Sequence, residues 1–194
     1  METIDDIIRR IFRESIQAKE AFLRDNLERV ARVVDVITDA LKKGNKILLF
    51  GNGGSAADAQ HIAAEFMNRF LIERPPLPAI ALTTDTSVLT AIANDYGFEQ
   101  AFARQVQGLG AAGDVLIAYS TSGNSPNVLK AIETARCLGM TVVGFTGASG
   151  GRMAALCDVC IRAPHDVSPV IQECHAAAGH TLCLLVEQLL CEGA

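Results

Sequence analysis

Beyond residue 45 the chain alternates short apolar runs with segments of helical spacing, and this alternation constrains the fold more than any other feature. The runs are four or five residues long and mainly apolar, without a polar residue at every second position. Short strands of this kind between helices are typical of a parallel sheet covered by helices on both faces. The predicted strands are Ile47–Phe50, Ala79–Leu82, Val115–Tyr119, Val142–Phe145 and Val159–Ala163.

The segments between these runs predict helices at Ser55–Phe70, Asp85–Asn94, Phe98–Leu109, Ser125–Leu138 and Gly151–Leu156, and a closing helix from about Pro169 to Leu190. We therefore predict a flavodoxin-like three-layer α/β sandwich with a five-stranded parallel sheet over residues 45–194. In such folds ligands bind at the carboxyl ends of the strands, which here means the loops 51–55, 83–87 and 120–125.

Two amphipathic helices are predicted before the sheet, within residues 1–44. The first covers residues 2–23, and the second begins after a cap at Asn26 and ends before Gly44. Their apolar positions are Ile7, Ile8, Ile11, Phe12, Ile16, Ala21 and Phe22, then Val30, Val33, Val34, Ile37 and Leu41. Because a five-stranded domain does not need both helices to close its core, we expect this extension to serve oligomerisation of a single domain that spans residues 1–194.

Charge and hydropathy argue against several classes of protein. The net charge is −5 and no Lys/Arg cluster is dense enough to follow a phosphate backbone, so nucleic acid is not expected as a ligand. No run of about 18 apolar residues predicts a membrane span, and the acidic N-terminus does not resemble a secretory signal. Most cysteines lie within apolar patterns, so we expect structural thiols, including the single CxxC pair Cys157 and Cys160, and a reducing, cytoplasmic location.

His61 and Glu65 offer a first pair of metal ligands. They lie four residues apart in the helix after the first strand, so their side chains share one face. Zinc accepts both imidazole nitrogen and carboxylate oxygen. In the alternative interpretation, Glu65 pairs with Arg69, also four residues away, and His61 is merely a partly exposed side chain.

The closing helix supplies His180 within an otherwise apolar stretch, where a metal and one acceptor would satisfy both ring nitrogens. Helical periodicity aligns Glu173 with His180 better than it aligns Gln172, so the residues alone leave the second ligand open. His175 and Cys174 are interpreted as surface and packing residues.

Two loops predict binding of an anionic sugar. Four hydroxyls in six residues of Ser120-Thr121-Ser122-Gly123-Asn124-Ser125, followed by Pro126 at a helix start, exceed what a capped turn requires and favour phosphate. The loop Gly51-Asn52-Gly53-Gly54-Ser55 is not GxGxxG and lacks the lysine of a P-loop. It favours a tight turn in which Asn52 and Ser55 contact sugar hydroxyls.

Four segments together resemble the sugar-isomerase (SIS) domain family, and within it the phosphoheptose isomerases. The segments are GNGGSAADAQHIAAEF, LTAIANDYGFEQAFARQ, STSGNSPNVLKAI and IQECHAAAGH, and the resemblance covers essentially the whole chain. It implies isomerisation of sedoheptulose 7-phosphate to D-glycero-D-manno-heptose 7-phosphate, the first step toward ADP- or GDP-heptose for surface polysaccharides such as lipopolysaccharide. It also implies a homotetramer with active sites between subunits.

The same resemblance implies a set of site residues. One zinc ion per subunit would be bound by His61, Glu65, Gln172 and His180, which selects Gln172 over Glu173. The implied substrate contacts are Asn52, Gly53, Gly54, Ser55, Glu65, Arg69, Asn94, Asp95, Ser120, Thr121, Ser122, Ser125 and Gln172. Glu65 and His180 are the candidate catalytic pair for proton transfer through an enediol. The chain departs from some members at Pro169, because they carry an acidic residue just before the IQE motif.

Other functions remain as alternatives to the isomerase. One alternative is a non-catalytic regulator, like those SIS-domain relatives that bind the bacterial replication initiator. Another is a sensor that binds a phosphosugar without converting it. The presence of His61, Glu65, Gln172 and His180 favours the enzyme. A nicotinamide-dependent enzyme is disfavoured because the GxGxxG pattern is missing.

Overall fold

Five parallel strands form one sheet in the order β2-β1-β3-β4-β5 in the computed structural model, which describes residues 2–191. The strands are β1 Ile47–Phe50, β2 Ala79–Ala81, β3 Val115–Ser120, β4 Thr141–Thr146 and β5 Val159–Arg162. From β1 the chain passes outward to β2 and then returns to β3 on the other side, so the order reverses between β1 and β3. The predicted flavodoxin-like sheet is confirmed.

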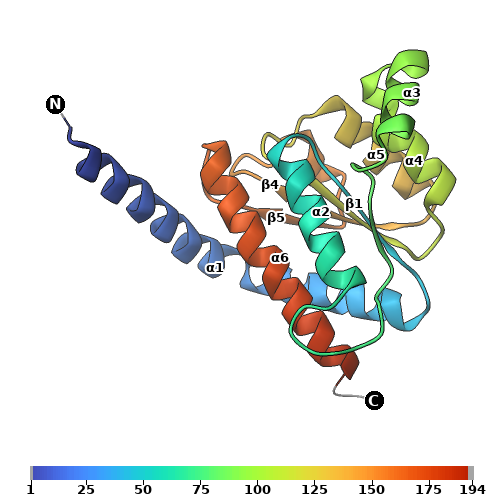
Figure 1. The fold of residues 1–194 in the computed structure, drawn as a ribbon, viewed down its shortest axis with the longest axis horizontal. Helices are drawn as coiled ribbons and strands as arrows, with labels where there is room; N and C mark the ends of the chain where they lie inside the picture. Colours follow the sequence, from blue (N-terminus) through green and yellow to red (C-terminus); the bar gives the residue numbers. More distant parts are fainter. Residues whose placement is uncertain (1, 192–194) are drawn as a thin grey trace.

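Helices cover both faces of this sheet (Figure 1). One face carries α1 Ile4–Lys42, α2 Gly54–Met67 and α6 Ser168–Cys191, and the other carries α3 Thr86–Tyr96, α4 Ala101–Leu109 and α5 Pro126–Cys137. Two short 3₁₀ helices, η1 Phe98–Gln100 and η2 Arg152–Ala155, lie between these elements. Alternate strand residues point to opposite faces, so Leu49 packs with the first set of helices and Leu48 with the second. Burial on both faces explains why the strands are apolar without alternation.

The N-terminal segment is one continuous helix, α1, so the prediction of two helices is wrong. Thr3 and Asp6 cap its start with reciprocal hydrogen bonds. Asn26 does not begin a second helix, because its buried amide donates to the carbonyls of Phe22 at 3.1 Å and Arg162 at 2.9 Å and accepts from the Arg162 N–H at 3.2 Å. The side chain therefore completes the hydrogen bonding of the edge strand β5 while the helix continues past it.

The two halves of α1 differ in burial. The C-terminal half packs on the sheet through Val33, Val34 and Ile37, which are buried as predicted. The N-terminal half extends away from the sheet (Figure 1), and most of the apolar face predicted there is open to solvent, with Phe12 68% exposed and Ile16 55% exposed, whereas Phe22 at its end is buried. An exposed apolar face of this kind marks an interaction surface.

Helix α6 owes its apolar composition to its place in the core. By length and hydropathy alone it would also suit a membrane span. Its residues Leu182 and Val186, however, are fully buried in the cluster formed by α1, α2 and one face of the sheet. The apolar residues on this side of α6 are therefore those expected of a helix that packs against a core.

The close approach of α2 and α6 at Gly179 gives a first testable prediction. A Cβ atom on Gly179 would lie 2.5 Å from Ile62 Cδ1 and 2.8 Å from Ile62 Cγ1. We expect Gly179→Ala to lower the free energy of unfolding by about 1–2 kcal/mol, because overpacking outweighs the gain in helix propensity. Gly108→Ala is the matched control, since a Cβ there meets no atom within 4 Å, and we expect it to stabilise by up to about 1 kcal/mol. Urea denaturation measures both, and stabilisation by both substitutions would contradict the packing argument.

Candidate metal and sugar-phosphate site

Two imidazoles and a carboxylate meet between α2 and α6. His61 and Glu65 of α2 and His180 of α6 present ligand atoms that all lie within 4.8 Å of one another. His61 Nε2 lies 3.1 Å from Glu65 Oε1 and 3.3 Å from His180 Nε2. Within residues 2–191 this is the one such group of three or more His, Cys, Asp or Glu side chains.

The spacing of these three side chains suits a divalent metal. In a tetrahedral zinc site with bonds of about 2.0–2.1 Å, neighbouring ligand atoms are about 3.3–3.4 Å apart. The two distances measured at His61 Nε2 are close to this value. Two histidines and one glutamate are also a donor set of catalytic zinc sites, in which the fourth position takes a further ligand.

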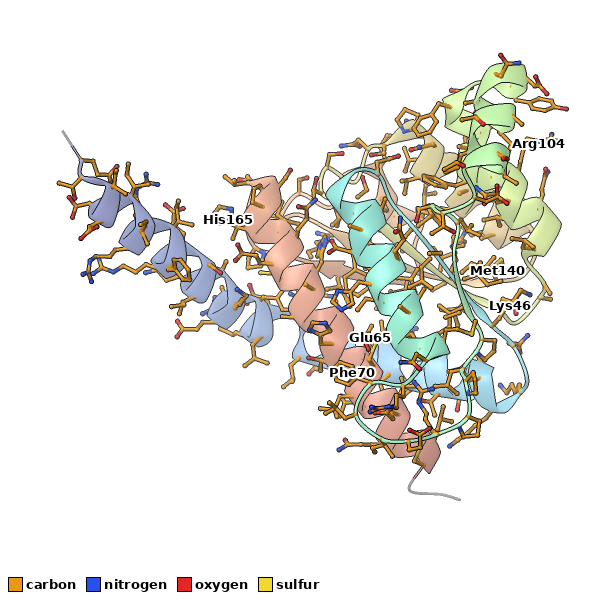
Figure 2. The ribbon with its side chains drawn as sticks, in the orientation of Figure 1. Lys46, Glu65, Phe70, Arg104, Met140 and His165 are labelled. Carbon is orange, nitrogen blue, oxygen red and sulfur yellow. The ribbon has the colours of Figure 1, made fainter. Side chains whose placement is uncertain are left out.

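Packing between the helices orients this group. Helices α2 and α6 run in the same direction, since Gln172 faces Gly54 at their start and Glu187 reaches the chain just beyond α2. Phe70 follows α2 and stacks on the His180 ring, with centroids 5.6 Å apart and an interplanar angle of 25°. Figure 2 shows Glu65 and Phe70 at the same end of α2, beside α6. The alternative pairing of Glu65 with Arg69 does not occur, because Arg69 Nε lies 3.4 Å from Glu73 Oε2 instead.

Gln172 and Glu173 point toward different helices. Glu173 accepts hydrogen bonds from Ser15 and Lys19 of α1, and these donors, Ser15 first, hold the pKa of its carboxyl below the usual value. The Gln172 amide lies against Gly54, where a Cβ would be 2.6 Å from Gln172 Nε2. Gln172 therefore faces α2, contrary to the ranking from periodicity. The Gln172 amide is closer to the Gly-rich loop than His61, Glu65 and His180 are, since Gly54 precedes His61 by about 10 Å along α2.

The hydroxyl-rich loop, residues 120–125, leads from β3 into α5. Ser125 occupies the N-cap position of α5 but makes no capping hydrogen bond, and its Oγ lies 3.0 Å from Ser120 Oγ. Thr121 Oγ1 lies 3.2 Å from the hydroxyl of Ser168, the first residue of α6. Because no side chain caps α5, the N–H groups of its first turn can bind an anion.

The Gly-rich loop lies beside this hydroxyl-rich loop. Asn52 forms a reciprocal amide pair with Asn127 of α5, at 3.0 and 2.9 Å. Gly53 adopts φ +57°, a conformation that other residues rarely adopt, and it leads into α2, where Ser55 is buried. A pocket of about 390 Å³ is lined by Asn52, Phe98, Glu99, Ser125, Pro126 and Asn127. Residues from both predicted sugar-phosphate loops thus line one pocket.

Three residues predicted to bind substrate lie apart from these groups. Asn94 and Asp95 occupy the exposed end of α3, where Asn94 donates to Asp95 at 2.8 Å. Arg69 is exposed and pairs with Glu73. Within the part of the chain that the structure describes, no polar contact joins these three residues to the hydroxyl-rich loop or to His61, Glu65 and His180.

Two polar residues near these groups were not predicted. Asp58 lies one helical turn before His61, and one of its carboxylate oxygens is buried without a hydrogen-bond partner. Burial raises the pKa of Asp58, although His61 opposes the shift. The i, i+3, i+7 spacing of Asp58, His61 and Glu65 was a signal in the sequence. Ser168 had no local signal, because its contact with Thr121 depends on how α6 packs against the loop.

His175 lies in the core, so the interpretation of His175 as a surface residue is wrong, whereas Cys174 is buried as a packing residue should be. His175 is fully buried beside Tyr119 and Phe145, and its Nε2 lies 3.2 Å from the Thr146 carbonyl oxygen. Burial lowers the pKa of His175 to about 4. The ring is therefore neutral near pH 7, and it takes no part in the group formed by His61, Glu65 and His180.

The depressed pKa of His175 predicts a loss of stability in mild acid. Between pH 7 and pH 5 the unfolded histidine, with a pKa of about 6.5, takes up a proton that the folded one, at about 4, does not. This difference is expected to cost about 2 kcal/mol of unfolding free energy at pH 5. His175→Gln should remove this part of the pH dependence. Urea denaturation at several pH values measures the slope, and an unchanged slope in the variant would count against the assignment.

Comparisons with known proteins extend these observations. The family described as the SIS domain matches residues 11–147. The phosphoheptose isomerase of Desulfovibrio desulfuricans is 55% identical over 187 residues, which cover 96% of this chain and 89% of the relative. That of Rhodospirillum rubrum is 57% identical over 176 residues, covering 90% and 94%. The solved phosphoheptose isomerase of Neisseria gonorrhoeae matches with a TM-score of 0.91 and 43% identity over 96% of this chain and all (100%) of that chain. The solved phosphoheptose isomerase of Francisella tularensis matches with a TM-score of 0.93 and 42% identity, and the match covers 96% of this chain and 99% of that chain.

Proposed function

Because the chain belongs to the phosphoheptose isomerases of the SIS-domain family, which are aldose–ketose isomerases, we propose that it converts sedoheptulose 7-phosphate into D-glycero-D-manno-heptose 7-phosphate. This reaction would open the synthesis of ADP- or GDP-heptose for surface polysaccharide, including lipopolysaccharide. Substrate and product are isomers, so the enzyme needs to move only protons and no external oxidant or reductant takes part.

The arrangement of His61, Glu65 and His180 carries this proposal. Their ligand atoms, all within 4.8 Å of one another, suit one zinc ion per subunit. Gln172 is the proposed fourth ligand, and its amide, which lies against Gly54 in the single chain, would have to turn toward the other three to bind the ion. A bound zinc ion would polarise the sugar carbonyl as a Lewis acid.

Glu65 and His180 are the proposed proton-transfer pair. A base removes a proton from C1 of the ketose, next to the carbonyl, and an acid returns a proton to C2 of the resulting enediol. Both side chains lie within 3.3 Å of His61 Nε2, so they reach the same small region. Stacking on Phe70 fixes the plane of the His180 ring, which orients its nitrogens for this transfer.

The two loops at the carboxyl ends of the strands are proposed to bind the substrate. The first N–H groups of α5 and the hydroxyls of Ser120, Thr121, Ser122 and Ser125 would hold the phosphate. The residues proposed to contact the sugar are Asn52, Gly53, Gly54, Ser55, Glu65 and Gln172. Asn94, Asp95 and Arg69 are proposed to join the site only in the assembled protein.

We propose a cytoplasmic homotetramer with active sites between subunits. Two surfaces support this assembly: the exposed apolar face of α1, and helix α3, in which no residue is buried in the single chain. A neighbouring subunit on α3 would also bring Asn94 and Asp95 near a second chain. Light scattering should therefore report four subunits, and a monomer at working concentration would contradict the proposal.

A proton NMR time course of sedoheptulose 7-phosphate with the zinc-loaded protein in deuterated water tests the function. We expect an aldose heptose phosphate that carries deuterium at C2, because an enediol exchanges its proton with solvent. An aldose without deuterium would still support isomerase activity, but the mechanism would then need a proton shielded from solvent or a hydride shift. No reaction, under conditions in which an authentic isomerase works, would favour a regulator or a phosphosugar sensor.

A further inference from the structure

Outside the proposed active site, two cysteines flank the start of the edge strand β5. Cys157 and Cys160 are both half-buried and both free. In the register of β4 and β5, Gly144 lies directly opposite Cys160. Residues that are opposite one another in neighbouring parallel strands project from the same face of the sheet.

The sulfur of Cys157 lies over Gly144. A Cβ atom on Gly144 would be 2.6 Å from Cys157 Sγ, so this sulfur occupies the space that a larger residue opposite Cys160 would fill. Three residues along a regular strand span about 10 Å, but neighbouring strands are only about 4.8 Å apart. Asp158 anchors the bend that brings Cys157 back, because its N–H donates to the Val142 carbonyl at 2.9 Å and its carboxylate accepts from the Val142 N–H at 2.8 Å. The two thiols therefore meet on one face of the sheet.

The surroundings make the two thiols unequal. The Cys157 side chain, and then the guanidinium groups of Arg162 and Arg29, lower the pKa of Cys160 to about 7 although burial opposes the shift. The Cys160 side chain and then burial raise the pKa of Cys157. A partly exposed cysteine beside cations is the more reactive type of cysteine. Cys160 is therefore the attacking nucleophile of the pair, and Cys157 is the resolving thiol that attacks the mixed disulfide in the second step.

A metal site at this pair is disfavoured by its ligand count. Zinc in structural sites takes four ligands, commonly at least two cysteines with further cysteine or histidine. Within the described residues, Cys157 and Cys160 have no third His, Cys, Asp or Glu placed to share an ion with them. Covalent chemistry between the two sulfurs needs no further ligand.

We propose that Cys157 and Cys160 form a reversible redox pair, which low-molecular-weight disulfides oxidise to an internal disulfide. The Cys160 thiolate attacks one sulfur of the small disulfide and releases the first thiol as thiolate. Cys157 then loses its proton to solvent and attacks Cys160 Sγ, which forms the Cys157–Cys160 bond and releases the second thiolate. Two protein thiols are oxidised, one small disulfide is reduced to two thiols, and the protons end on the released thiolates. In a reducing cytoplasm the oxidised form would be transient.

Full-length reduced protein incubated in mixtures of glutathione and glutathione disulfide tests this proposal. After acid quenching and alkylation, peptide mass mapping should find a disulfide between Cys157 and Cys160. The exposed Cys137 serves as the internal control, since it should form at most a glutathione adduct. Glutathione adducts at both Cys157 and Cys160 without a link between them, or no reaction at either while Cys137 reacts, would overturn the proposal.

Two single variants test the assigned order of the thiols. Cys157→Ser should trap a stable glutathione adduct on Cys160, and Cys160→Ser should leave Cys157 largely reduced. At pH 7 we expect Cys160 in the first variant to react severalfold faster than Cys157 in the second, because Arg162 and Arg29 remain beside Cys160 while Cys157 stays buried beside Asp158. Equal rates would overturn the assigned order. Circular dichroism checks that both variants are folded.

Discussion

Replacing Glu65 by glutamine, or His180 by glutamine, is expected to lower kcat for sedoheptulose 7-phosphate by about 10²–10⁴-fold. Each substitution removes a group that can exchange a proton, while it keeps the size of the side chain close to the original. A smaller change is expected in KM, because the proposed phosphate contacts lie in the separate loop 120–125. Initial rates measured over a range of substrate concentrations, from below KM to saturation, separate the two parameters.

Glu173→Gln is the matched control for these variants. Glu173 lies in the same helix as His180, but its carboxylate binds Ser15 and Lys19 of α1 and faces away from α2. Its removal should leave kcat unchanged. Zinc content is measured in every variant, and chelation of the wild-type metal should abolish turnover until zinc is restored. If Glu65→Gln and His180→Gln both turned over near the wild-type rate, the proposed proton-transfer pair would be wrong.

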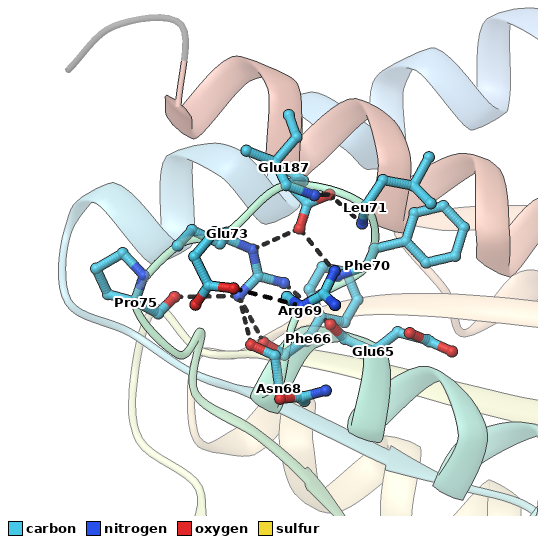
Figure 3. Close-up of polar contacts among 11 residues, drawn as sticks. Glu65, Phe66, Asn68, Arg69, Phe70, Leu71, Glu73, Pro75 and Glu187 are labelled. Carbon is cyan, nitrogen blue, oxygen red and sulfur yellow. Dashed lines mark hydrogen bonds and ion pairs between the residues drawn. The ribbon is translucent and has the colours of Figure 1, made fainter.

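Replacing Glu187 by glutamine is expected to lower the free energy of unfolding by about 3–5 kcal/mol. The Glu187 carboxylate is fully buried and accepts from the N–H groups of Phe70, Leu71 and Ile72 at 2.7–2.9 Å. It also accepts from Arg74 Nε at 3.0 Å, and Figure 3 shows these contacts converging on one carboxylate. Glutamine would leave the buried Arg74 guanidinium without its counter-charge. Urea denaturation measures the loss.

The pH dependence of this effect gives it a second readout. Burial alone would raise the pKa of Glu187, but the three N–H donors and Arg74 outweigh it and leave the pKa below the ordinary value of 4.5. The stabilisation by the Glu187 carboxylate is therefore complete above pH 4.5, and it is lost as the pH falls through the lower pKa that Glu187 has in the folded protein. The difference between wild type and Glu187→Gln should shrink in that acid range. The exposed Glu173→Gln again serves as control, with an expected loss of about 1 kcal/mol or less, and an equal loss in both variants would contradict the argument.

Glu187 also connects stability to the proposed active site. Its carboxylate accepts a hydrogen bond from the N–H of Phe70, and the Phe70 ring stacks on the His180 ring. Loss of this anchor should therefore disorder the His180 ring as well as destabilise the protein. This predicts that Glu187→Gln weakens zinc binding at temperatures at which the variant remains folded.

Much of the fold could be predicted from local patterns in the sequence. The five strands and the helices between them were found within a few residues, because a strand buried on both faces requires a continuous apolar run. The error at Asn26 has a physical reason. A polar residue in an apolar stripe commonly caps a helix, whereas here its partner is the backbone of Arg162, more than a hundred residues away.

For the proposed site, the sequence by itself determined the groups that share one helix or one loop. His61 and Glu65 follow from the helical repeat, and the hydroxyls of residues 120–125 follow from their density after a strand. Only the tertiary structure decided which groups from separate segments meet. The packing of α6 between α1 and α2 turns Gln172 toward Gly54 and Glu173 toward Lys19, and it brings His180 to His61. These pairings depend on the rotation and depth at which α6 sits against its neighbours, which the helical repeat of α6 alone does not specify.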